Sequence, residues 1–547
     1  MIGAAMEHYT ERHLAGRFGS RRTPVYGTQG MVAASQPLAA QAGLQMLLAG
    51  GTAADAAVAT AAALVVVEPM STGIGGDAFA LVYDAGTGAV RALNGSGRAP
   101  QALTRDLIAA RGHTEMPLLG WLPVTVPGAV AAWADLLAAH GRMTLAEVLA
   151  PAIRYAEAGF AVSETIARGW AHLAPKIAQQ AAAARTYLID GKPPLVGTVV
   201  RQPGLARSLR LIAEHGAAAM YTGELAQAIV AASEREGGVL ALEDLAAHTS
   251  TWQDPLRVRY RDVEVLQCPP NGQGIVALMA LGILDGLDLA AHPAGSPAAL
   301  HLQIEALRLA FADAAAYVAD PAMASVPVEL LLSDANTARR RALIDPAHAM
   351  TRVPITPLPG GHDTVYFSIV DAAGNAVSFI NSLYYGFGAG VVAGETGICM
   401  QNRGAGFVLD AAHPNALEPG KRPYHTIIPG MALRDGRLWA SFGVMGGFMQ
   451  PQGHVQTLVN LIDYRMNAQE ALDAPRFELI EPYRAQKSVA LEYGAPMRAA
   501  LAALGHDIAA DRSEQFGFGG GQIITVDAHG VRCGGTDPRK DGSVVAY

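Results

Sequence analysis

Cysteine is scarce in this sequence, with three residues among 547, at Cys268, Cys399 and Cys533. Their number is odd, they lie far apart, and no CxxC spacing occurs. These features disfavour both a disulfide framework and a zinc cluster. Unpaired and scattered cysteines fit a reducing compartment, and we expect a cytoplasmic protein.

Charged residues are also few, at 16% of the chain, and lysine and arginine form no long basic run. The formal net charge is -8. Binding to nucleic acid depends on positive side chains that neutralise phosphates. The sequence therefore predicts that nucleic acid is not a partner.

Long apolar runs are missing too. The most lipid-like stretch, residues 53–67, is rich in alanine and contains Asp55, which favours a buried helix over a membrane span. The N-terminal segment MIGAAMEHYTERHLAGRFGSRRT alternates charges and contains no apolar core of the length that a secretory signal needs. We expect neither a membrane segment nor export.

Apolar residues as a whole are plentiful, at 51% of the chain, as in a large and well-buried α/β protein. A chain of this length is expected to form two to four hydrophobic cores. Periodicity predicts helices over 36–50, 53–67 and much of 128–247, a β-hairpin in FALVYDAGTGAVRAL, and short strands with Gly-rich loops over 364–547. Prolines between Pro321 and Pro359 predict an exposed connection.

A second hairpin is predicted in GGHDTVYFSIVDAAGNAV, residues 360–377. Strands over 364–371 and 375–382 flank a three-residue loop whose last residue, Gly374, suits a positive φ. This register places Thr364 opposite Ser382, with the two hydroxyls on one face and the Cβ atoms about 5 Å apart. Such pairs are also ordinary sheet contacts, so the geometry alone leaves a structural interpretation open.

Threonine becomes a nucleophile only when a base takes its proton. One solution makes the threonine the first residue of a chain, because its own α-amino group, with a pKa near 8, then serves as the base. Such a chain must first be cut before Thr364. The bond between Asp363 and Thr364, which follows the exposed connection, is the predicted cut point.

The chain resembles the γ-glutamyltranspeptidase family over nearly all of residues 30–547. The resemblance rests on an ordered set of motifs: GMVAASQPLAAQAG, GGTAADAAVA, GIGGDAF, VPGAVAAW, LAPAIRYAEAGF, PPNGQG, EALRLAFAD, DTVYFSIVDAAGNAV, FGAGVVAGETGI, PGKRP, MGG and TDPRKDG. Single motifs are weak signals, whereas an ordered set at family-like separations is specific.

The resemblance implies an α/β (α+β) fold, the four-layer αββα sandwich of the N-terminal-nucleophile hydrolases. It implies that self-cleavage divides a precursor into a helix-rich large subunit, 1–363, which includes the carboxylate-binding side, and a small subunit, 364–547. The subunits would form a heterodimer, and a dimer of heterodimers is a further expectation. Thr364 would be the nucleophile, Ser382 would orient it, and the N–H groups of Gly446 and Gly447 would form the oxyanion hole. No metal or organic cofactor is required.

The sequence departs from the family where members that act on glutathione hold the α-ammonium of the donor. Gly406 and Arg403 stand where an aspartate and a Gln or Glu are expected. Tyr384 stands in place of an asparagine, and His425 and Thr426 replace a Ser-Ser pair. Because arginine stays protonated, Arg403 should repel an ammonium and favour a carboxylate, although a structural ion pair is an alternative.

A second candidate for the carboxylate anchor is Arg98, in NGSGRAP, about two residues out of register with the corresponding family arginine. The departures resemble the branch that includes oxamate amidohydrolase and some cephalosporin acylases. We therefore predict a self-cleaving amidohydrolase for a small anionic amide. The alternatives are a γ-glutamyltransferase or glutathione hydrolase and, from another class, an uncleaved binding homologue without activity.

Overall fold

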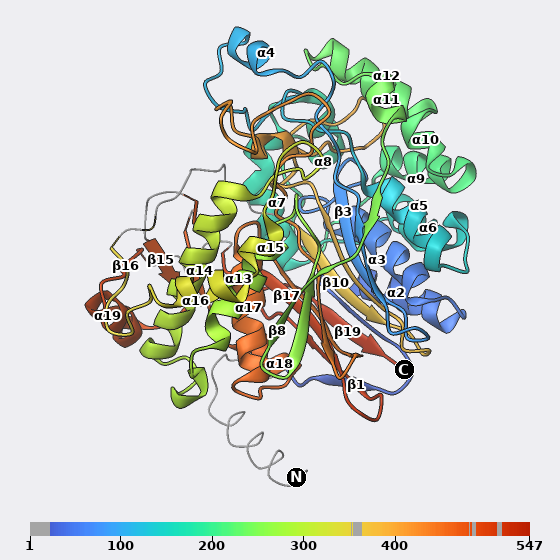
Figure 1. Ribbon diagram of the computed structural model, residues 1–547. Coiled ribbons are helices and arrows are strands. Elements are labelled where there is room, and N and C mark those ends of the chain that lie inside the picture. Colours follow the sequence, from blue (N-terminus) through green and yellow to red (C-terminus); the bar gives the residue numbers. More distant parts are fainter. Residues whose placement is uncertain (1–21, 352, 354–363, 481, 484–487, 511–516) are drawn as a thin grey trace.

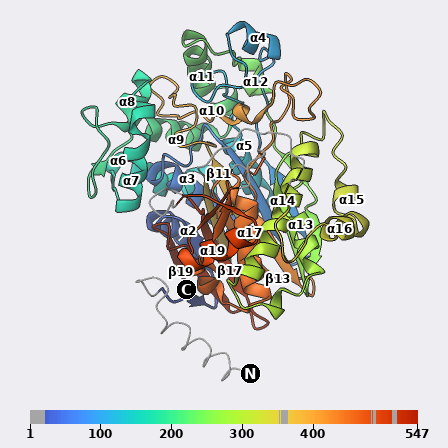
Figure 2. The same ribbon diagram turned by 90° about the vertical axis from the view of Figure 1, so that its left-hand side faces the viewer.

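The computed structural model describes residues 22–351, 353, 364–480, 482–483, 488–510 and 517–547. Two seven-stranded sheets occupy its centre, and helices cover the outer face of each sheet (Figure 1). A view turned by 90° shows the helices α13, α14 and α17 in front of the strands (Figure 2). The predicted αββα arrangement is confirmed.

The first sheet has the order β19-β2-β10-β11-β3-β4-β7, and every neighbouring pair is antiparallel. Its strands are β2 (Met31–Ala34), β3 (Asp77–Tyr83), β4 (Val90–Asn94), β7 (Thr251–Gln253), β10 (Val365–Val370), β11 (Ala376–Ser382) and β19 (Ser543–Ala546).

The second sheet has the order β1-β18-β17-β13-β12-β9-β8 and is also antiparallel throughout. Its strands are β1 (Val25–Gly27), β8 (Leu256–Tyr260), β9 (Val263–Gln267), β12 (Gly430–Arg434), β13 (Arg437–Met445), β17 (Gly520–Val526) and β18 (Arg532–Thr536). Two smaller sheets contain β5 (Phe160–Ala161) with β6 (Val199–Val200), and β14 (Phe477–Leu479) with β15 (Ser488–Leu491) and β16 (Asp507–Ile508).

Helices from the first half of the chain pack on the first sheet. They include α2 (Pro37–Leu48), α3 (Ala53–Val67), α5 (Ala129–His140), α6 (Leu145–Ala158), α7 (Glu164–Ile177), α8 (Ala181–Tyr187), α9 (Pro203–His215), α10 (Ala218–Tyr221) and α11 (Glu224–Arg235), all of which contribute to one apolar core. The short helices α4 (Arg105–Ala110) and α12 (Leu242–Ala246) lie beyond them.

The second sheet is covered by α13 (Gly274–Asp285), α14 (Pro297–Tyr317), α17 (Met449–Ile462) and α18 (Ala468–Asp473). Nearby lie α15 (Val328–Leu331), α16 (Asp334–Arg341) and α19 (Ala495–Ala503), and two 3-10 turns complete the description: η1 (Leu289–Ala291) and η2 (Arg403–Gly406). The connection predicted over 321–359 is described only in part, and that part contains α15 and α16 instead of a plain surface loop.

Side chains along β10 alternate between two apolar cores, one on each face of the first sheet. Val365 and Phe367 face the helices on the first sheet, whereas Tyr366 and Val370 belong to the core between the two sheets. Met431 and Met445 enter that middle core from the second sheet. Side chains at even positions of β10 therefore point toward the second sheet.

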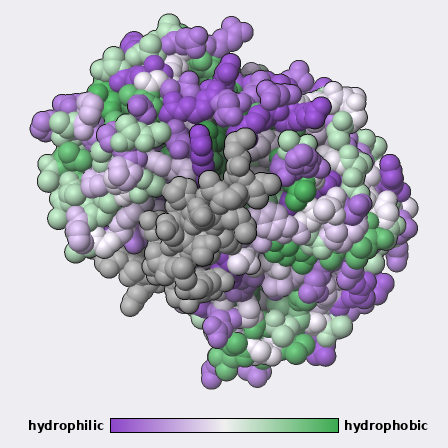
Figure 3. All heavy atoms as spheres, turned by 90° about the horizontal axis from the view of Figure 1, so that it is seen from below, coloured by the Kyte–Doolittle hydropathy of each residue, from purple (hydrophilic) through white to green (hydrophobic). Residues whose placement is uncertain are grey.

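The stretch predicted as a buried helix forms α3, all of whose residues are buried. Thr52 caps its N-terminus: the Asp55 N–H donates to Thr52 Oγ1 at 3.3 Å, and the Thr52 N–H donates to Asp55 Oδ2 at 2.7 Å. Among the described residues, no helix is long and apolar enough to cross a membrane. The face seen in Figure 3 carries hydrophilic and hydrophobic side chains side by side.

The predicted hairpin is confirmed, register included. Val365 pairs with Asn381 and Val370 with Ala376, and Gly374 adopts a φ of +89° in the loop. One further step along the ladder places the residue before β10, Thr364, next to Ser382, the last residue of β11.

The boundary predicted between residues 363 and 364 does not separate two structural units. In the first sheet, β10 and β11 lie between β2 and β3, so strands from both sides of the boundary alternate. In the second sheet, the block from β18 to β12 is flanked by β1 and by β9. Fragments 1–363 and 364–547 would therefore remain joined by both sheets.

Candidate functional site

The site begins with two buried hydroxyls. Thr364 Oγ1 and Ser382 Oγ lie 3.1 Å apart, and both residues are completely buried. Thr364 has the same parity as Tyr366, so its side chain is directed toward the second sheet. Asp363, on the other side of the predicted cut, lies outside the described residues.

Two N–H groups donate to the Ser382 hydroxyl oxygen. The Tyr384 N–H donates at 2.8 Å and Arg403 Nη2 donates at 3.1 Å. A hydroxyl has one proton and two lone pairs, so these donors occupy its accepting capacity. Either hydroxyl can be the donor in the contact with Thr364 Oγ1, and the two N–H donors to Ser382 favour Ser382 in that role. Tyr384 turns the chain here with a φ of +82°, a conformation that is uncommon for a bulky residue.

Arg403, the first residue of η2, is a fully buried cation beside these hydroxyls. Its Nη1 donates to Thr426 Oγ1 at 2.8 Å, and the guanidinium carbon lies 4.2 Å from the centre of the Tyr384 ring. Within the described residues, Nε has no hydrogen-bond partner, and no ion pair to a carboxylate is formed. Burial lowers the pKa of Arg403 to about 10, while Asp77 raises it, so the group is protonated at neutral pH.

The sequence patterns did not identify Asp77 as a site residue, although it lies in the GIGGDAF motif. It begins β3, directly opposite Ser382 in the ladder, and is completely buried. Its Oδ1 accepts from Gln401 Nε2 at 2.9 Å and from the N–H groups of Gly97 at 3.1 Å and Gly128 at 3.2 Å. A single acid within a strand that is otherwise apolar was the signal available in the sequence.

His425 completes the surroundings of Asp77. His425 Nε2 donates to Asp77 Oδ2 at 3.0 Å, and the Ile427 N–H donates to His425 Nδ1 at 3.3 Å, which fixes a neutral tautomer. Burial and the charge of Arg403 lower the pKa of His425 to about 3, although Asp77 raises it. Burial also raises the pKa of Asp77, but His425 and Arg403 lower it further, so the carboxyl is ionised. Both ring nitrogens of His425 are thus occupied within the protein.

The two glycines predicted for the oxyanion hole form the turn between β13 and α17. Their φ angles are +129° at Gly446 and +59° at Gly447, which point successive N–H groups away from a regular strand. In the described chain, neither N–H takes part in a loop, turn or cap hydrogen bond. Gln273 Nε2 ties the turn to the site, because it donates to Gly447 O at 2.9 Å and to Thr426 O at 2.7 Å.

Packing between the sheets brings this turn to the same end as Thr364. Ser368 Oγ of β10 lies 2.9 Å from Ser441 Oγ of β13, and the Tyr366 ring lies against Gly443. Going from Ser368 back to Tyr366 on β10 therefore corresponds to going from Ser441 forward to Gly443 on β13. Two more residues in the same directions bring Thr364 to the end of β13, where the glycine turn begins.

Arg98 is placed apart from this cluster. Its Nη1 donates to Gly420 O at 3.0 Å and lies 3.4 Å from Asp320 Oδ2, and 37% of its side chain is exposed. No hydrogen bond or ion pair of the described residues joins Arg98 to Thr364, Ser382 or Arg403. Of the two candidate anchors, Arg403 is therefore the one in contact with the hydroxyl pair.

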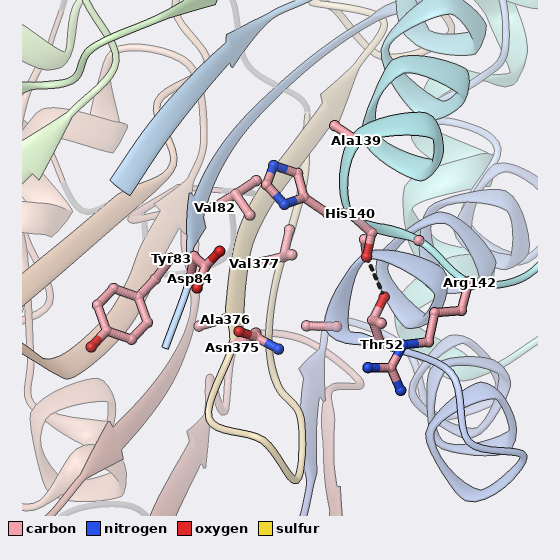
Figure 4. Close-up of a pocket in the computed structure, with 13 residues that line it drawn as sticks. Thr52, Val82, Tyr83, Asp84, Ala139, His140, Arg142, Asn375, Ala376 and Val377 are labelled. Atoms are coloured by element: carbon pink, nitrogen blue, oxygen red, sulfur yellow. Dashed lines mark hydrogen bonds between the residues drawn. The ribbon is translucent and has the colours of Figure 1, made fainter. Parts of the chain in front are cut away.

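A cavity of about 220 Å³ lies at the opposite end of the hairpin (Figure 4). Its lining includes Thr52, Tyr83, His140 and Asn375, and Thr52 Oγ1 donates to the His140 carbonyl at 2.9 Å. The length of β11 separates this cavity from Ser382 by about 20 Å. None of the predicted site residues lines it.

Comparison with known proteins agrees with the fold and with the motifs. The sequence profile described as gamma-glutamyltranspeptidase matches residues 39–547. The glutathione hydrolase-like YwrD proenzyme of Bacillus subtilis is 39% identical over 525 residues, which cover 95% of this chain and 99% of that protein. The oxamate amidohydrolase proenzyme of Klebsiella pneumoniae is 37% identical over 535 residues, with coverage of 95% and 99%.

A solved structure extends this similarity to three dimensions. The crystal structure of cephalosporin acylase from Bacillus halodurans superimposes with a TM-score of 0.90 at 48% sequence identity, covering 97% of this chain and 98% of that one. Sequence and fold agree over almost the whole length. The chain therefore belongs to the γ-glutamyltranspeptidase family of hydrolases.

Proposed function

We propose that the chain cleaves itself between Asp363 and Thr364, and that Thr364 then hydrolyses amides of small acyl groups that carry a carboxylate. One observation carries this proposal: the buried Arg403 guanidinium donates to the same Ser382 hydroxyl that contacts the Thr364 hydroxyl. Arg403 has no ionic partner in the part of the chain that the structure describes. An unpaired positive charge beside a nucleophile is suited to an anionic substrate.

In the cleavage step, Thr364 Oγ attacks the carbonyl carbon of Asp363. The peptide C–N bond breaks, an ester to Thr364 forms, and the Thr364 nitrogen takes up the hydroxyl proton and becomes a free amine. Water then hydrolyses the ester, which leaves a carboxylate on Asp363 and a chain that begins with Thr364. The buried contact with Ser382 supports this role, because a donated proton stabilises the developing charge on Thr364 Oγ.

In turnover, the α-amino group of Thr364 takes the hydroxyl proton as Oγ attacks the amide carbonyl of the substrate. The N–H groups of Gly446 and Gly447 would stabilise the oxyanion, and the α-ammonium would return the proton to the leaving amine. Water then releases the acid from the acyl-enzyme. The substrate carboxylate would bind to Arg403, whose Nε has no partner among the described residues and therefore leaves donor capacity for it.

A γ-glutamyl donor is the alternative, because the YwrD relative is named a glutathione hydrolase-like protein. Such a donor has an α-ammonium that needs an acceptor. Asp77, the carboxylate described in the site, is completely buried and already accepts from four donors. This disfavours a γ-glutamyl donor and supports a substrate without an α-ammonium, such as the oxamate in the name of the Klebsiella pneumoniae relative.

Self-cleavage is tested by intact mass and a denaturing gel. We expect the wild-type chain to separate into fragments ending at Asp363 and beginning at Thr364. Thr364→Ala should remain a single chain without amidase activity, whereas Thr364→Ser should cleave slowly because a hydroxyl is retained. Fully active material that contains only the undivided chain would disprove the proposal and favour another nucleophile.

The acyl group is tested with a panel of amides: oxamate, glutaryl anilide, pentanoyl anilide, γ-glutamyl anilide and glutathione. Glutaryl and pentanoyl anilide have acyl chains of equal length and differ in the terminal carboxylate. We expect oxamate or glutaryl anilide to give the highest kcat/KM. A preference for γ-glutamyl anilide would establish the alternative, and equal rates on the glutaryl and pentanoyl compounds would exclude a carboxylate anchor for acyl groups of this length.

A further inference from the structure

Asp77 is a buried charge that the proposed reaction does not use. Its two oxygens accept four hydrogen bonds, from His425, Gln401 and two backbone N–H groups. Three of these bonds reach Oδ1 and one, from His425, reaches Oδ2. The carboxylate is therefore held in place through both of its oxygens.

Asp77 and Arg403 are the opposite charges on either side of Ser382. Asp77 faces Ser382 across the ladder, and Arg403 donates to the Ser382 hydroxyl. They form no ion pair, yet each acts on the other: Arg403 lowers the pKa of Asp77, and Asp77 raises the pKa of Arg403. The carboxylate thus offsets the field of the guanidinium without occupying its N–H groups.

We infer that Asp77 is a positioning residue that sets how strongly Arg403 binds the carboxylate of the substrate and of the product, and that His425 holds Asp77 in this role. The inference rests on the proposed function, because it takes Arg403 as the carboxylate anchor. It assigns to His425 a contact with Asp77 in place of the contact with substrate expected from the sequence.

The opposing charges of Asp77 and Arg403 affect the release of the product after hydrolysis. The substrate is an amide with one carboxylate, and water converts the amide into a second carboxylate on the released acid. The product therefore carries one more negative charge than the substrate and is attracted more strongly by an isolated cation. A fixed negative charge near Arg403 weakens the binding of the product more than that of the substrate, which favours release.

The first test is the variant Asp77→Asn. Its matched control is Asp371→Asn, because Asp371 is also a buried aspartate but lies at the far end of β10. Both variants are first checked for self-cleavage. At an effective dielectric constant of about 20, one unit charge about 10 Å away changes a binding constant roughly tenfold. We therefore expect Asp77→Asn to lower KM for glutaryl anilide and to tighten inhibition by glutarate by about that factor, with the larger effect on glutarate.

Pentanoyl anilide is the neutral control in these measurements, and oxamate with oxalate serves as a second probe pair. KM for pentanoyl anilide should change little in Asp77→Asn, and Asp371→Asn should behave as wild type with every probe. Unchanged binding of glutarate and oxalate in Asp77→Asn would overturn the inference while leaving the proposed function intact. If the wild type shows no preference for either anionic probe, the proposed function fails and the inference fails with it.

A second test uses pH and does not depend on Asp77→Asn folding. The titratable or charged groups around Asp77 are His425, Arg403, His248, Arg422 and Tyr221. Burial lowers the pKa of His248 to about 4, so it stays neutral across the range measured. His425→Leu removes the donor to Asp77 Oδ2 and should raise the pKa of Asp77, whereas His425→Gln retains a donor.

In His425→Leu, Asp77 takes up a proton as the pH falls, and the offsetting negative charge disappears. KM for glutaryl anilide should therefore decrease toward low pH in this variant, relative to KM for pentanoyl anilide. The wild type and His425→Gln should show no such ionisation between pH 5.5 and 8. Identical profiles for His425→Leu and His425→Gln would contradict the role assigned to the pair.

Discussion

At the scale of single residues, Arg403 is the most informative side chain. A buried guanidinium is costly unless its charge and its N–H groups find partners, and here two hydroxyls and an aromatic ring are its contacts. The sequence identified this residue through a departure from the family pattern. Its contact with Ser382 could not be predicted, because Arg403 lies in the turn η2 and Ser382 at the end of strand β11.

The variant Arg403→Ala should raise KM for glutaryl anilide by tenfold or more, since a hydrogen bond to a charged group contributes about 1.5–3 kcal/mol. KM for pentanoyl anilide should change far less. Arg98→Ala is the comparison, because Arg98 is already engaged by Asp320 and Gly420. Steady-state kinetics on the two anilides decide between the anchors, and a larger effect of Arg98→Ala would transfer the role to that residue.

At the scale of secondary-structure elements, the turn between β13 and α17 determines the geometry of the predicted oxyanion hole. A Cβ atom at Gly446 would lie 3.1 Å from the Gly519 Cα, and the φ of +129° would be strained for any other residue. The turn therefore depends on glycine for both space and conformation.

Gly446→Ala keeps the backbone N–H but displaces it, and should lower kcat by up to about 100-fold, the usual effect of losing one oxyanion donor, with a smaller change in KM. Gly436→Ala, in the turn between β12 and β13, is the control: its φ is +73° and no heavy atom lies within 4 Å of an added Cβ. It should lose stability through backbone strain but keep its kcat. Equal losses of kcat in both variants would mean that strain alone explains the effect.

At the scale of the whole molecule, both sheets are built from both predicted fragments. Cutting before Thr364 would leave the ladders between β2 and β10 and between β11 and β3 in place. We expect fragments 1–363 and 364–547 to elute together from a sizing column and to unfold in one transition. Separation of the fragments without denaturant would contradict this expectation.

Acid should destabilise the fold through its buried histidines. Burial lowers the pKa of His248 and His506 to about 4 and that of His425 and His454 to about 3, from a usual value of 6.5. Below pH 6.5 the unfolded chain therefore binds protons that the folded chain does not. The free energy of unfolding should fall as the pH drops from 6.5 toward 4, by at most about 1.4 kcal/mol per pH unit for each such histidine.

Thermal unfolding followed by circular dichroism between pH 8 and 4.5 measures this dependence. His454→Gln removes one of the titrating groups and retains an acceptor for Gln267 Nε2, which lies 3.1 Å from His454 Nδ1. Its unfolding temperature should depend less steeply on pH than that of the wild type. Parallel curves would show that His454 does not contribute.

By itself, the sequence determined the hairpin register of Thr364 and Ser382, the buried helix α3 and the family. These depend on turn residues, on periodicity and on motifs, all of which are local in the chain. Only the tertiary structure decided that Asp77 pairs with His425 and that Arg403 reaches Ser382 while Arg98 does not. Asp77 and His425 are 348 positions apart, and such contacts follow from how two sheets pack, which no local pattern encodes.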